Sequence, residues 1–461
     1  FEIQHFAEGS MQDSLPNIKS FFRSIEVTRS VQQTLIRFML SILVREGRNS
    51  AMHVSSVMLS QPLHRVQPAR FLARVRWRAM NILGQFVNKL LEQQCWSGQY
   101  ILILDSTLVG HQGPTMENTY STGNRRRRPQ KNRRYRKYKY AGKSCHCFVF
   151  GVLLTPEGLR LPLVKPLYTR QYAGQKKKKH RTQAQLGAQI IRELPVPAGV
   201  HVVVLGDTAF DAKVVRGACQ QRGYHWIFPV NANRVFAGKR GQRPRVSTRI
   251  NQLSQKHLDT IRLSRTGGTY ARQRRLSQHR ASAKRKTRTY YVHSEKRQIH
   301  NVGQVLLVIS SSKLKQNKPV RESTRILMTN ATDRTGRQIV ELYCVRWQIE
   351  LFFKELKGIL GMHQYQFKRF DAVEGWIEIV LITFVYLEWT RDRKLKDRRT
   401  TRENRQRWQH QRCYGMRQAI LIGIRIRHQK WIQKRLKSKN GIKTIAKILT
   451  THLACEYRCA V

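Results

Sequence analysis

Residues 100–230 alternate short apolar runs with amphipathic segments, and this alternation constrains the fold more than any other feature of the chain. Strand-like runs occur at "YILILDST", at "CHCFVFGVLL" and the run after it around a turn at Pro156–Gly158, at "VHVVVLGD" and at "YHWIFPV". The segment "QKKKKHRTQAQLGAQIIREL" and the segment that follows Asp207 have the apolar spacing of helices. The order strand, strand, strand, helix, strand, helix, strand predicts an α/β fold with a mixed sheet.

The flanking regions differ from this core in composition. Helical periodicity dominates before it, strand signals return at "VGQVLLVIS" and "TRILMTN" inside a strongly basic region, and the tail is basic and mostly helical. The N-terminal part is interpreted as a DNA-end-binding module, with a packing or dimerisation unit as the alternative. The predicted division is 1–96 helical, 97–230 first part of the core, 231–330 basic β-rich insertion, 331–390 last part of the core, and 391–461 basic helical region.

The charge of the chain indicates its partner. Lys and Arg number 87 against 27 Asp and Glu, a formal net charge of +60. Such a chain repels itself, and a polyanion relieves that repulsion. Because the charge extends along the whole chain, nucleic acid fits better than a membrane. Arg-rich stretches at 123–140, where tyrosines interleave with the cations, and at 270–288 are the densest examples.

Membrane insertion and secretion are not expected. The apolar run 376–389 is too short for a span and contains Glu378 and Glu388, so it predicts a buried core helix. The first residues lack the layout of a signal peptide, and the eight cysteines include no CxxC pair. Reduced cysteines and a cytoplasmic location are therefore predicted.

Two aspartates each end an apolar run, Asp105 after "ILIL" and Asp207 after "VVVLG". Functional groups collect at strand ends in α/β sheets, because loops open over that edge. A single acid at such a place is more often a turn or helix cap. Asp207 could start the helix that follows, although Asp211 is the better candidate for that cap.

The segment "YCVRWQIELFFKELKGILG", residues 343–361, predicts one amphipathic helix. A solvated face with ion pairs at i, i+4 spacing would by itself explain its polar side. Together with the two aspartates, however, Glu350 completes a set of hard oxygen ligands that suits two divalent cations and phosphodiester displacement. The expected core side is Val345, Ile349, Phe352, Phe353, Leu356 and Ile359. The expected polar side is Tyr343, Arg346, Glu350, Lys354 and Lys357.

"LDST", "LGDTAFD" and "TRILMTNATDRTGRQIVELYCVRWQIELFFKELKGILGMHQYQ" resemble the DDE transposases of bacterial insertion sequences. The spacing of Tyr343, Arg346, Glu350 and Lys357 is similar to the Y-(2)-R-(3)-E-(6)-K signature of the cut-and-paste branch. The resemblance covers residues 100–390 and implies a ribonuclease H-like catalytic core with a mixed sheet, a β-rich insertion between the second Asp and the Glu, and flanking helical regions.

The resemblance also implies residue roles, a cofactor and partners. The implied catalytic metal ligands are Asp105, Asp207 and Glu350. The implied contacts to DNA phosphates are Tyr343, Arg346 and Lys357, with Lys354 as a weaker one. The cofactor would be two Mg²⁺ ions, with Mn²⁺ able to substitute. Hydrolysis at each transposon end would release a 3′-OH, which attacks a phosphodiester of the opposite strand or of target DNA. The partners would be double-stranded DNA and a second copy of the chain on that DNA, in a nucleoid-associated cytoplasmic protein.

Two other functions are open to this sequence. One is a non-catalytic DNA-binding or architectural protein derived from a transposase, for which the charge alone would suffice. The other is a metal-dependent nuclease of the same fold that does not transfer strands. The three intact acids argue against the first, and only a joining assay separates the second from a transposase.

Overall fold

The computed structural model describes residues 15–23, 25–44, 54, 64, 66–111, 116–121, 144–238, 243–264, 287–397 and 399–437. The Tyr-containing basic stretch 123–140 and most of the Arg-rich stretch 270–288 lie outside these described residues. The chain forms two compact units. One unit combines residues 1–93, 109–146 and 354–461, and the other combines residues 94–108 and 147–353. The five-part division expected from the sequence stays a prediction.

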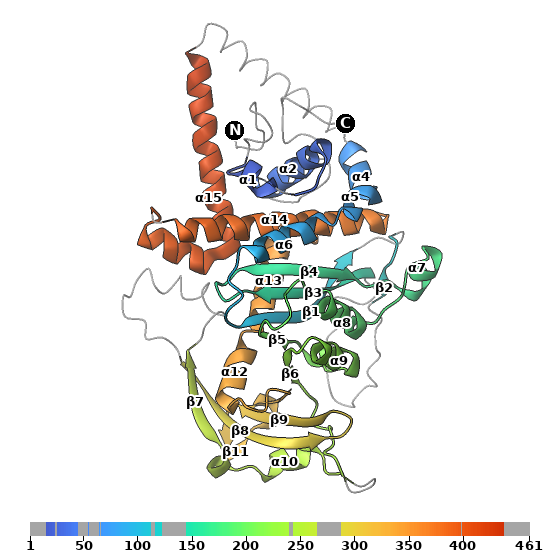
Figure 1. Cartoon of the computed structure of the whole chain (residues 1–461), viewed down its shortest axis with the longest axis vertical. Coiled ribbons are helices and arrows are strands. Elements are labelled where there is room, and N and C mark those ends of the chain that lie inside the picture. The colour runs from blue at the N-terminus through green and yellow to red at the C-terminus, as the bar shows by residue number, and fades with distance from the viewer. Residues whose placement is uncertain are drawn as a thin grey trace, which may run out of the picture. The chain divides into compact units, whose positions relative to one another are not determined.

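The first unit is built around α14 (Phe370–Lys396), the long helix drawn in orange in Figure 1. Its apolar stretch is buried, as the sequence predicts, because four other helices pack on it. Its buried Glu388 accepts a hydrogen bond from Arg391 at 2.9 Å. Among the described helices, none combines the length and apolarity that a membrane crossing requires. The packing helices are α2 (Arg29–Val44), α4 (Val66–Ala73), α6 (Ile82–Glu92) and α15 (Arg402–Leu436).

Shorter elements complete the first unit. Phe21 of α1 stacks on Phe86 of α6 with ring centroids 4.1 Å apart. At Gly375 a Cβ atom would lie 2.7 Å from the Leu72 carbonyl oxygen, so glycine allows α4 to approach α14 closely. These elements are α1 (Ile18–Phe22), α5 (Val75–Ala79) and β2 (Tyr120–Ser121), which pairs with the start of β3.

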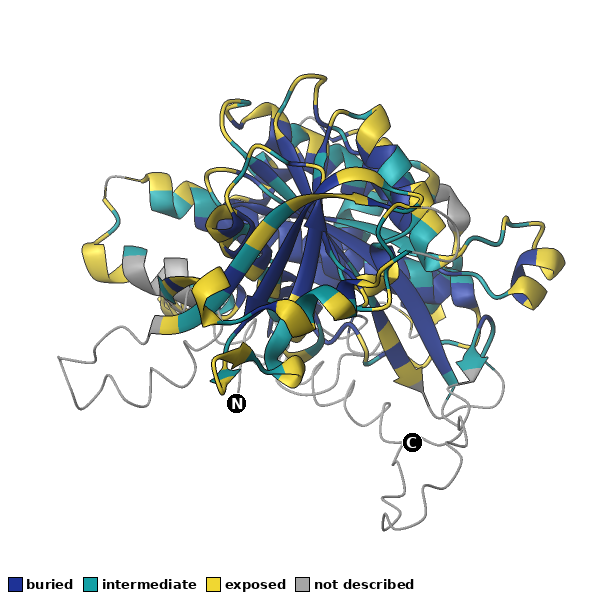
Figure 2. Ribbon diagram, turned by 90° about the horizontal axis from the view of Figure 1, so that it is seen from below, coloured by how far each residue is buried: buried dark blue, intermediate teal, exposed yellow. Residues whose placement is uncertain are grey.

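The second unit contains a mixed sheet with the strand order β3-β1-β5-β6-β12-β9-β8-β7, in which β4 also pairs with β3. β1, β5 and β6 are parallel, and the strands from β12 to β7 are antiparallel. Every residue of β5 is buried, as expected for a central parallel strand, and Figure 2 shows the sheet as a dark blue core. The parallel strands are β1 (Tyr100–His111), β5 (Val202–Leu205) and β6 (His225–Pro229).

Local sequence explains most elements around the parallel strands. β3 (Ser144–Leu154) and β4 (Arg160–Pro166) form the predicted hairpin, and Gly158 adopts a φ of 85° in its turn. Both helices expected after them are present, and they pack against each other. The prediction of an α/β fold with a mixed sheet is confirmed, and the arrangement is consistent with a ribonuclease H-like core. The helices here are α7 (Arg170–Gln175), α8 (Gln183–Arg192) and α9 (Lys213–Gln221).

The region between β6 and β12 extends this sheet with long antiparallel strands. The strand signal "TYYVH" covers only the first part of β8, which continues through the polar residues up to Ile299. Those residues pair with β9 from Ser294↔Val308 to Ile299↔Gly303, so pairing with a neighbour overrides their polar composition. The elements are α10 (Val246–Gln252), β7 (Asp259–Ser264), β8 (Thr287–Ile299), β9 (Gly303–Ser311), β10 (Leu314–Lys315), β11 (Lys318–Pro319) and β12 (Thr324–Thr329).

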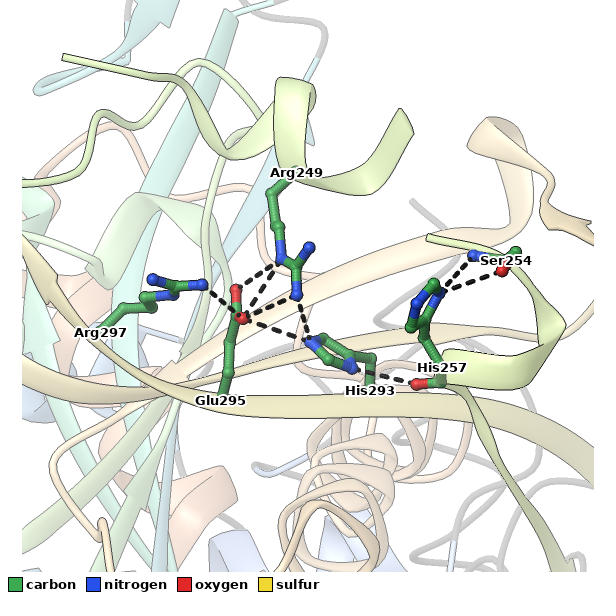
Figure 3. Close-up of polar contacts among 6 residues, drawn as sticks. All are labelled: Arg249, Ser254, His257, His293, Glu295 and Arg297. Atoms are coloured by element: carbon green, nitrogen blue, oxygen red, sulfur yellow. Dashed lines mark hydrogen bonds and ion pairs between the residues drawn. The ribbon is translucent and has the colours of Figure 1, made fainter. Parts of the chain in front are cut away.

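A polar cluster joins α10 to β8 (Figure 3). Glu295 accepts hydrogen bonds from Arg249 at 3.2 Å and from Arg297 at 3.0 Å, and His293 Nε2 lies 3.3 Å from the same carboxylate. His293 Nδ1 in turn contacts the carbonyl oxygen of His257 at 3.0 Å. Burial would raise the pKa of Glu295, but the hydrogen bonds from Arg297, Arg249 and His293 lower it to about 2.

We expect Glu295→Gln to cost most stability near neutral pH and progressively less in acid. A carboxylate whose pKa is lowered on folding stabilises the native state above its unfolded pKa, and this contribution is lost as the pH falls toward about 2. Urea unfolding of wild type and variant at pH 6.5 and pH 4 would measure the difference. The exposed Glu322→Gln is the control, and a Glu295→Gln penalty that does not shrink in acid would contradict the prediction.

Candidate active site

Asp105 lies within β1, and Asp207 lies in the loop that follows the neighbouring parallel strand β5. The last registered pair of β1 and β5 is Ile103↔Leu205. Each aspartate lies two residues beyond its member of that pair, at equivalent steps along the chain. The prediction that Asp105 ends its strand is wrong, since β1 continues to His111. β1 has a long strand beside it on one side only: β3 has 11 residues, whereas β5 on the other side ends at Leu205.

The loop after β5 fixes the backbone at Asp207. Asp207 is the N-cap of the short 3₁₀ turn Thr208–Phe210, and its Oδ1 accepts a hydrogen bond from the Ala209 N–H at 2.9 Å. Phe210 is fully buried. The carboxylate is thus held at the C-terminal edge of the parallel strands, where α/β folds gather their functional groups.

Asp211 does not cap α9, contrary to the sequence prediction. The N-cap of α9 is Ala212, which makes no side-chain capping bond. The Asp211 side chain is 4% exposed and forms ion pairs with Arg216 and Arg234. Two guanidinium groups offer a buried carboxylate stronger hydrogen bonds than a helix N-terminus does. Asp211 therefore connects the loop that carries Asp207 to the chain that enters the β-rich region.

The segment 343–361 is two helices and not the single helix that the sequence predicts. α12 (Gly336–Cys344) ends before a turn at Val345 and Arg346, and α13 (Trp347–Gly358) follows. Backbone bonds across the turn join residues three apart, as in Arg346 N–H to Tyr343 O at 3.1 Å and Ile349 N–H to Arg346 O at 3.1 Å. Tyr343 and Glu350 therefore lie on different helices, although the charges of both act on Arg346.

Both helices are positioned by elements of the second unit. Thr335 and Gln338 form a capping box at the start of α12, which packs on β8 and β9. The first half of α13 contacts the sheet through Phe352 and Phe353, whose ring centroids lie 5.8 and 5.3 Å from that of Phe150. Of the expected core side, Ile349, Phe352 and Leu356 are fully buried. The core prediction is confirmed for these three.

Arg346 connects two of the three predicted acids. Its Nη1 lies 3.4 Å from Asp105 Oδ2, and its Nη2 lies 2.6 Å from Glu350 Oε1. The side chains of Arg346 and Asp105 are 15% and 18% exposed, and that of Glu350 is 34% exposed. Asp105 and Glu350 are far apart in the sequence, yet both contact the same guanidinium group.

Asp207 lies near enough to Asp105 for its charge to affect that carboxyl group. Burial raises the pKa of Asp105, and the negative charges of Asp207 and Glu350 raise it further. A hydrogen bond from the Ser106 N–H and the charge of Arg346 oppose this rise. Three carboxylates that repel one another are a hard-oxygen donor set suited to a divalent cation. Among the described residues, however, no three acid, His or Cys side chains already surround a single ion position.

The other predicted site residues differ in exposure. Tyr343 is only 8% exposed, its hydroxyl lies 3.5 Å from the Gly206 carbonyl oxygen, and it also forms a hydrogen bond with Arg325. Tyr343 therefore contacts the residue before Asp207. Lys354 is exposed and follows Glu350 by one turn of α13, and the partly buried Lys357 follows by almost two. Burial lowers the pKa of Lys357.

Sequence reasoning missed two residues around these acids. The local sequence does not mark Arg325 of β12, because its hydrogen-bond partner Tyr343 lies on a different element. Asp211 was noticed only as a cap, although its spacing of four residues from Asp207 in "DTAFD" was a usable signal. Their roles depend on contacts between elements, which the local pattern does not contain.

The chain was also compared with known proteins. A family model, the Transposase DDE domain, matches residues 96–386, which is more than half of the chain. The matched range contains the three acids and the turn that carries Arg346. The search of curated proteins returned no match. Members of this family generally use divalent metal ions and act on DNA. The match confirms the resemblance at the level of the family, and the chain belongs to the DDE transposases.

Proposed function

We propose that this chain is the transposase of an insertion sequence, of the cut-and-paste branch, which cleaves DNA at the transposon ends and joins them to target DNA. The observation that carries the proposal is the convergence of three acids. Asp105 lies on β1, Asp207 lies two residues after the end of the adjacent parallel strand β5, and Glu350 is connected to Asp105 through Arg346. A protein that only bound DNA would have no need to collect repelling carboxylates at one edge of a sheet.

The acids fit a metal-dependent phosphodiester reaction. Two bound Mg²⁺ ions, or Mn²⁺ in their place, would supply activation of an attacking oxygen and stabilisation of the leaving oxygen. Asp105 would hold an ion from strand β1, Asp207 would do so from the capped turn after β5, and Glu350 would complete the set from the first turn of α13. The three carboxylates repel one another, and a bound cation would relieve this repulsion.

The cations near the acids would hold the DNA. Arg346 can bind a phosphate with two nitrogen atoms, and Lys354 and Lys357 offer point charges farther along α13. Tyr343 stays a predicted DNA contact, although it is 8% exposed. A homodimer on double-stranded DNA, holding two ends together, and association with the nucleoid are parts of the same proposal.

We expect Lys354→Gln to weaken binding of transposon-end DNA several-fold and to reduce the dependence of log K on log salt by about one. The exposed ammonium group would neutralise one phosphate and release its counterion. Binding titrations across a range of salt concentrations would measure both quantities. Lys315→Gln removes the same charge from an exposed position on β10 and is the control. Equal salt slopes for wild type and Lys354→Gln would argue against a phosphate contact.

A joining assay tests the proposal. Purified protein is incubated with Mg²⁺, labelled DNA carrying the ends that flank its own gene, and a target plasmid. Cleaved and joined products that disappear with a chelator are expected from a transposase. Cleavage without joined products would favour a nuclease of the same fold. Binding of the correct ends without any cleavage would favour an architectural protein and would overturn the proposal.

A further inference from the structure

We propose that Arg346 is an exchangeable internal cation: in the metal-free chain it pairs with Asp105 and Glu350, and it gives up these carboxylates when divalent ions bind and turns to a DNA phosphate. Metal binding and DNA binding would then strengthen each other. The inference rests on the proposed function and adds to it how metal binding and DNA binding are coupled through Arg346.

Arg346 contacts one carboxylate oxygen of each of two acids that are proposed to bind the metal ions. Two different nitrogen atoms of one guanidinium contact two different acids, at 3.4 Å to Asp105 Oδ2 and 2.6 Å to Glu350 Oε1. The side chain of Arg346 is 15% exposed, so these are its main surroundings and not a transient surface contact. A divalent ion bound by the same oxygens would lie close to the positively charged guanidinium, and repulsion between these two cations is strong in a partly buried site. Arg346 and the ion therefore compete.

The backbone at Arg346 allows the exchange. The residue lies in the turn between α12 and α13, whose backbone bonds join residues three apart. Its neighbour Trp347 is 44% exposed, so this corner of the chain reaches the surface. Arg346 can swing from the acids toward solvent by rotating its own side-chain bonds, without unwinding either helix. A guanidinium released in this way is free to bind a phosphate with two hydrogen bonds.

Charge and linkage give the expected consequences. The three acids and Arg346 together carry a formal charge of −2, and removal of Arg346 makes it −3 at the same place. Metal affinity should then rise, because a competitor is lost and the net negative charge increases. In the wild type, the ion that releases Arg346 raises affinity for DNA, and by reciprocity DNA raises affinity for the ion. Both effects should become smaller together when Arg346 is replaced, because only the coupling that comes from neutralising the carboxylates is left.

The first test measures Mn²⁺ binding to the full chain without DNA, by electron paramagnetic resonance of the free ion. Arg346→Gln is expected to bind Mn²⁺ about tenfold more tightly than the wild type. Arg337→Gln is the matched control, because Arg337 forms an exposed pair with Glu341 on α12 at 3.0 Å. Its Mn²⁺ affinity should equal that of the wild type. Unchanged or weaker Mn²⁺ binding by Arg346→Gln would overturn the inference.

The second test measures affinity for transposon-end DNA with and without Ca²⁺, used in place of Mg²⁺ to limit cleavage. We expect Ca²⁺ to tighten DNA binding by the wild type at least about threefold more than it tightens binding by Arg346→Gln, because Ca²⁺ neutralises the carboxylates in both proteins but releases a guanidinium only in the wild type. A purely structural role of Arg346 predicts instead a lower unfolding midpoint and an equal Ca²⁺ effect in both proteins, which would also overturn the inference.

Two further variants separate this inference from the proposed function. Asp105→Asn and Glu350→Gln should lose Mn²⁺ binding if the acids form the metal site. If both retain wild-type Mn²⁺ affinity, the proposed function fails and the inference fails with it. If both lose Mn²⁺ while Arg346→Gln binds it as the wild type does, only the exchange at Arg346 is refuted.

Discussion

Glu350→Gln is expected to lower the rate of DNA cleavage at the transposon ends by about a thousandfold or more, with little change in binding of those ends. The substitution keeps the size of the side chain but removes one negative charge from the donor set. Metal ions contribute several kcal/mol of charge stabilisation in the transition state, and each 1.36 kcal/mol changes a rate about tenfold. Single-turnover cleavage of labelled ends, together with gel-shift affinity, would measure the two effects separately.

The control for this prediction is Glu341→Gln, which removes a carboxylate from the exposed side of the neighbouring helix α12. It should cleave at the wild-type rate. Asp105→Asn and Asp207→Asn should show the same loss as Glu350→Gln if, as proposed, the three acids bind the metal ions together. Cleavage by Glu350→Gln within about tenfold of the wild type would remove this residue from the catalytic centre.

Asp211→Ala is expected to lower the free energy of unfolding by about 3 kcal/mol. The Asp211 side chain is 4% exposed, and it is the shared partner of Arg216 and Arg234. Removing it leaves two guanidinium groups facing each other without their common carboxylate. Arg234 is 30% exposed and can turn to water, so the cost should lie at the lower end for a broken buried pair. Chemical denaturation of both proteins would measure the difference.

Asp333→Ala, at an exposed position, is the matched control for Asp211→Ala and should change stability by less than about 0.5 kcal/mol. Asp211→Asn keeps the shape of the side chain and should also lower stability, because it lacks the negative charge that pairs with Arg216 and Arg234. Cleavage activity should fall with Asp211→Ala even where the protein is folded, since the Asp207 loop loses its connection to Arg234. A stability loss below about 1 kcal/mol would show that the two guanidinium groups find other partners.

Much of the fold follows from local patterns in the chain. Buried strands such as β5 are continuous apolar runs, and the middle of α14 is a long apolar stretch that other helices cover. The β3–β4 hairpin depends on a turn in which Gly158 takes a positive φ. These features require only a residue and its sequence neighbours, so they were predictable.

The candidate site was predictable in part. Asp105, Asp207 and Glu350 could be chosen because acids beside apolar runs and within a spaced motif are unusual. That Asp105 lies inside its strand could not be foreseen, since the length of β1 depends on which strands lie beside it. The break at Val345 and Arg346 was equally hidden, because both residues fit a continuous helix by periodicity alone.

The sequence by itself indicated the type of most main elements and the family, and it pointed to the three acids as candidates, because periodicity and motif spacing are properties of the chain. Only the tertiary structure decided which of those residues meet. It paired β1 with β5, the strands that lead to Asp105 and Asp207, buried Asp211 against two arginines, and placed Arg346 between Asp105 and Glu350. Such contacts join residues that are far apart along the chain, and their energies depend on burial and distance, which no local pattern contains.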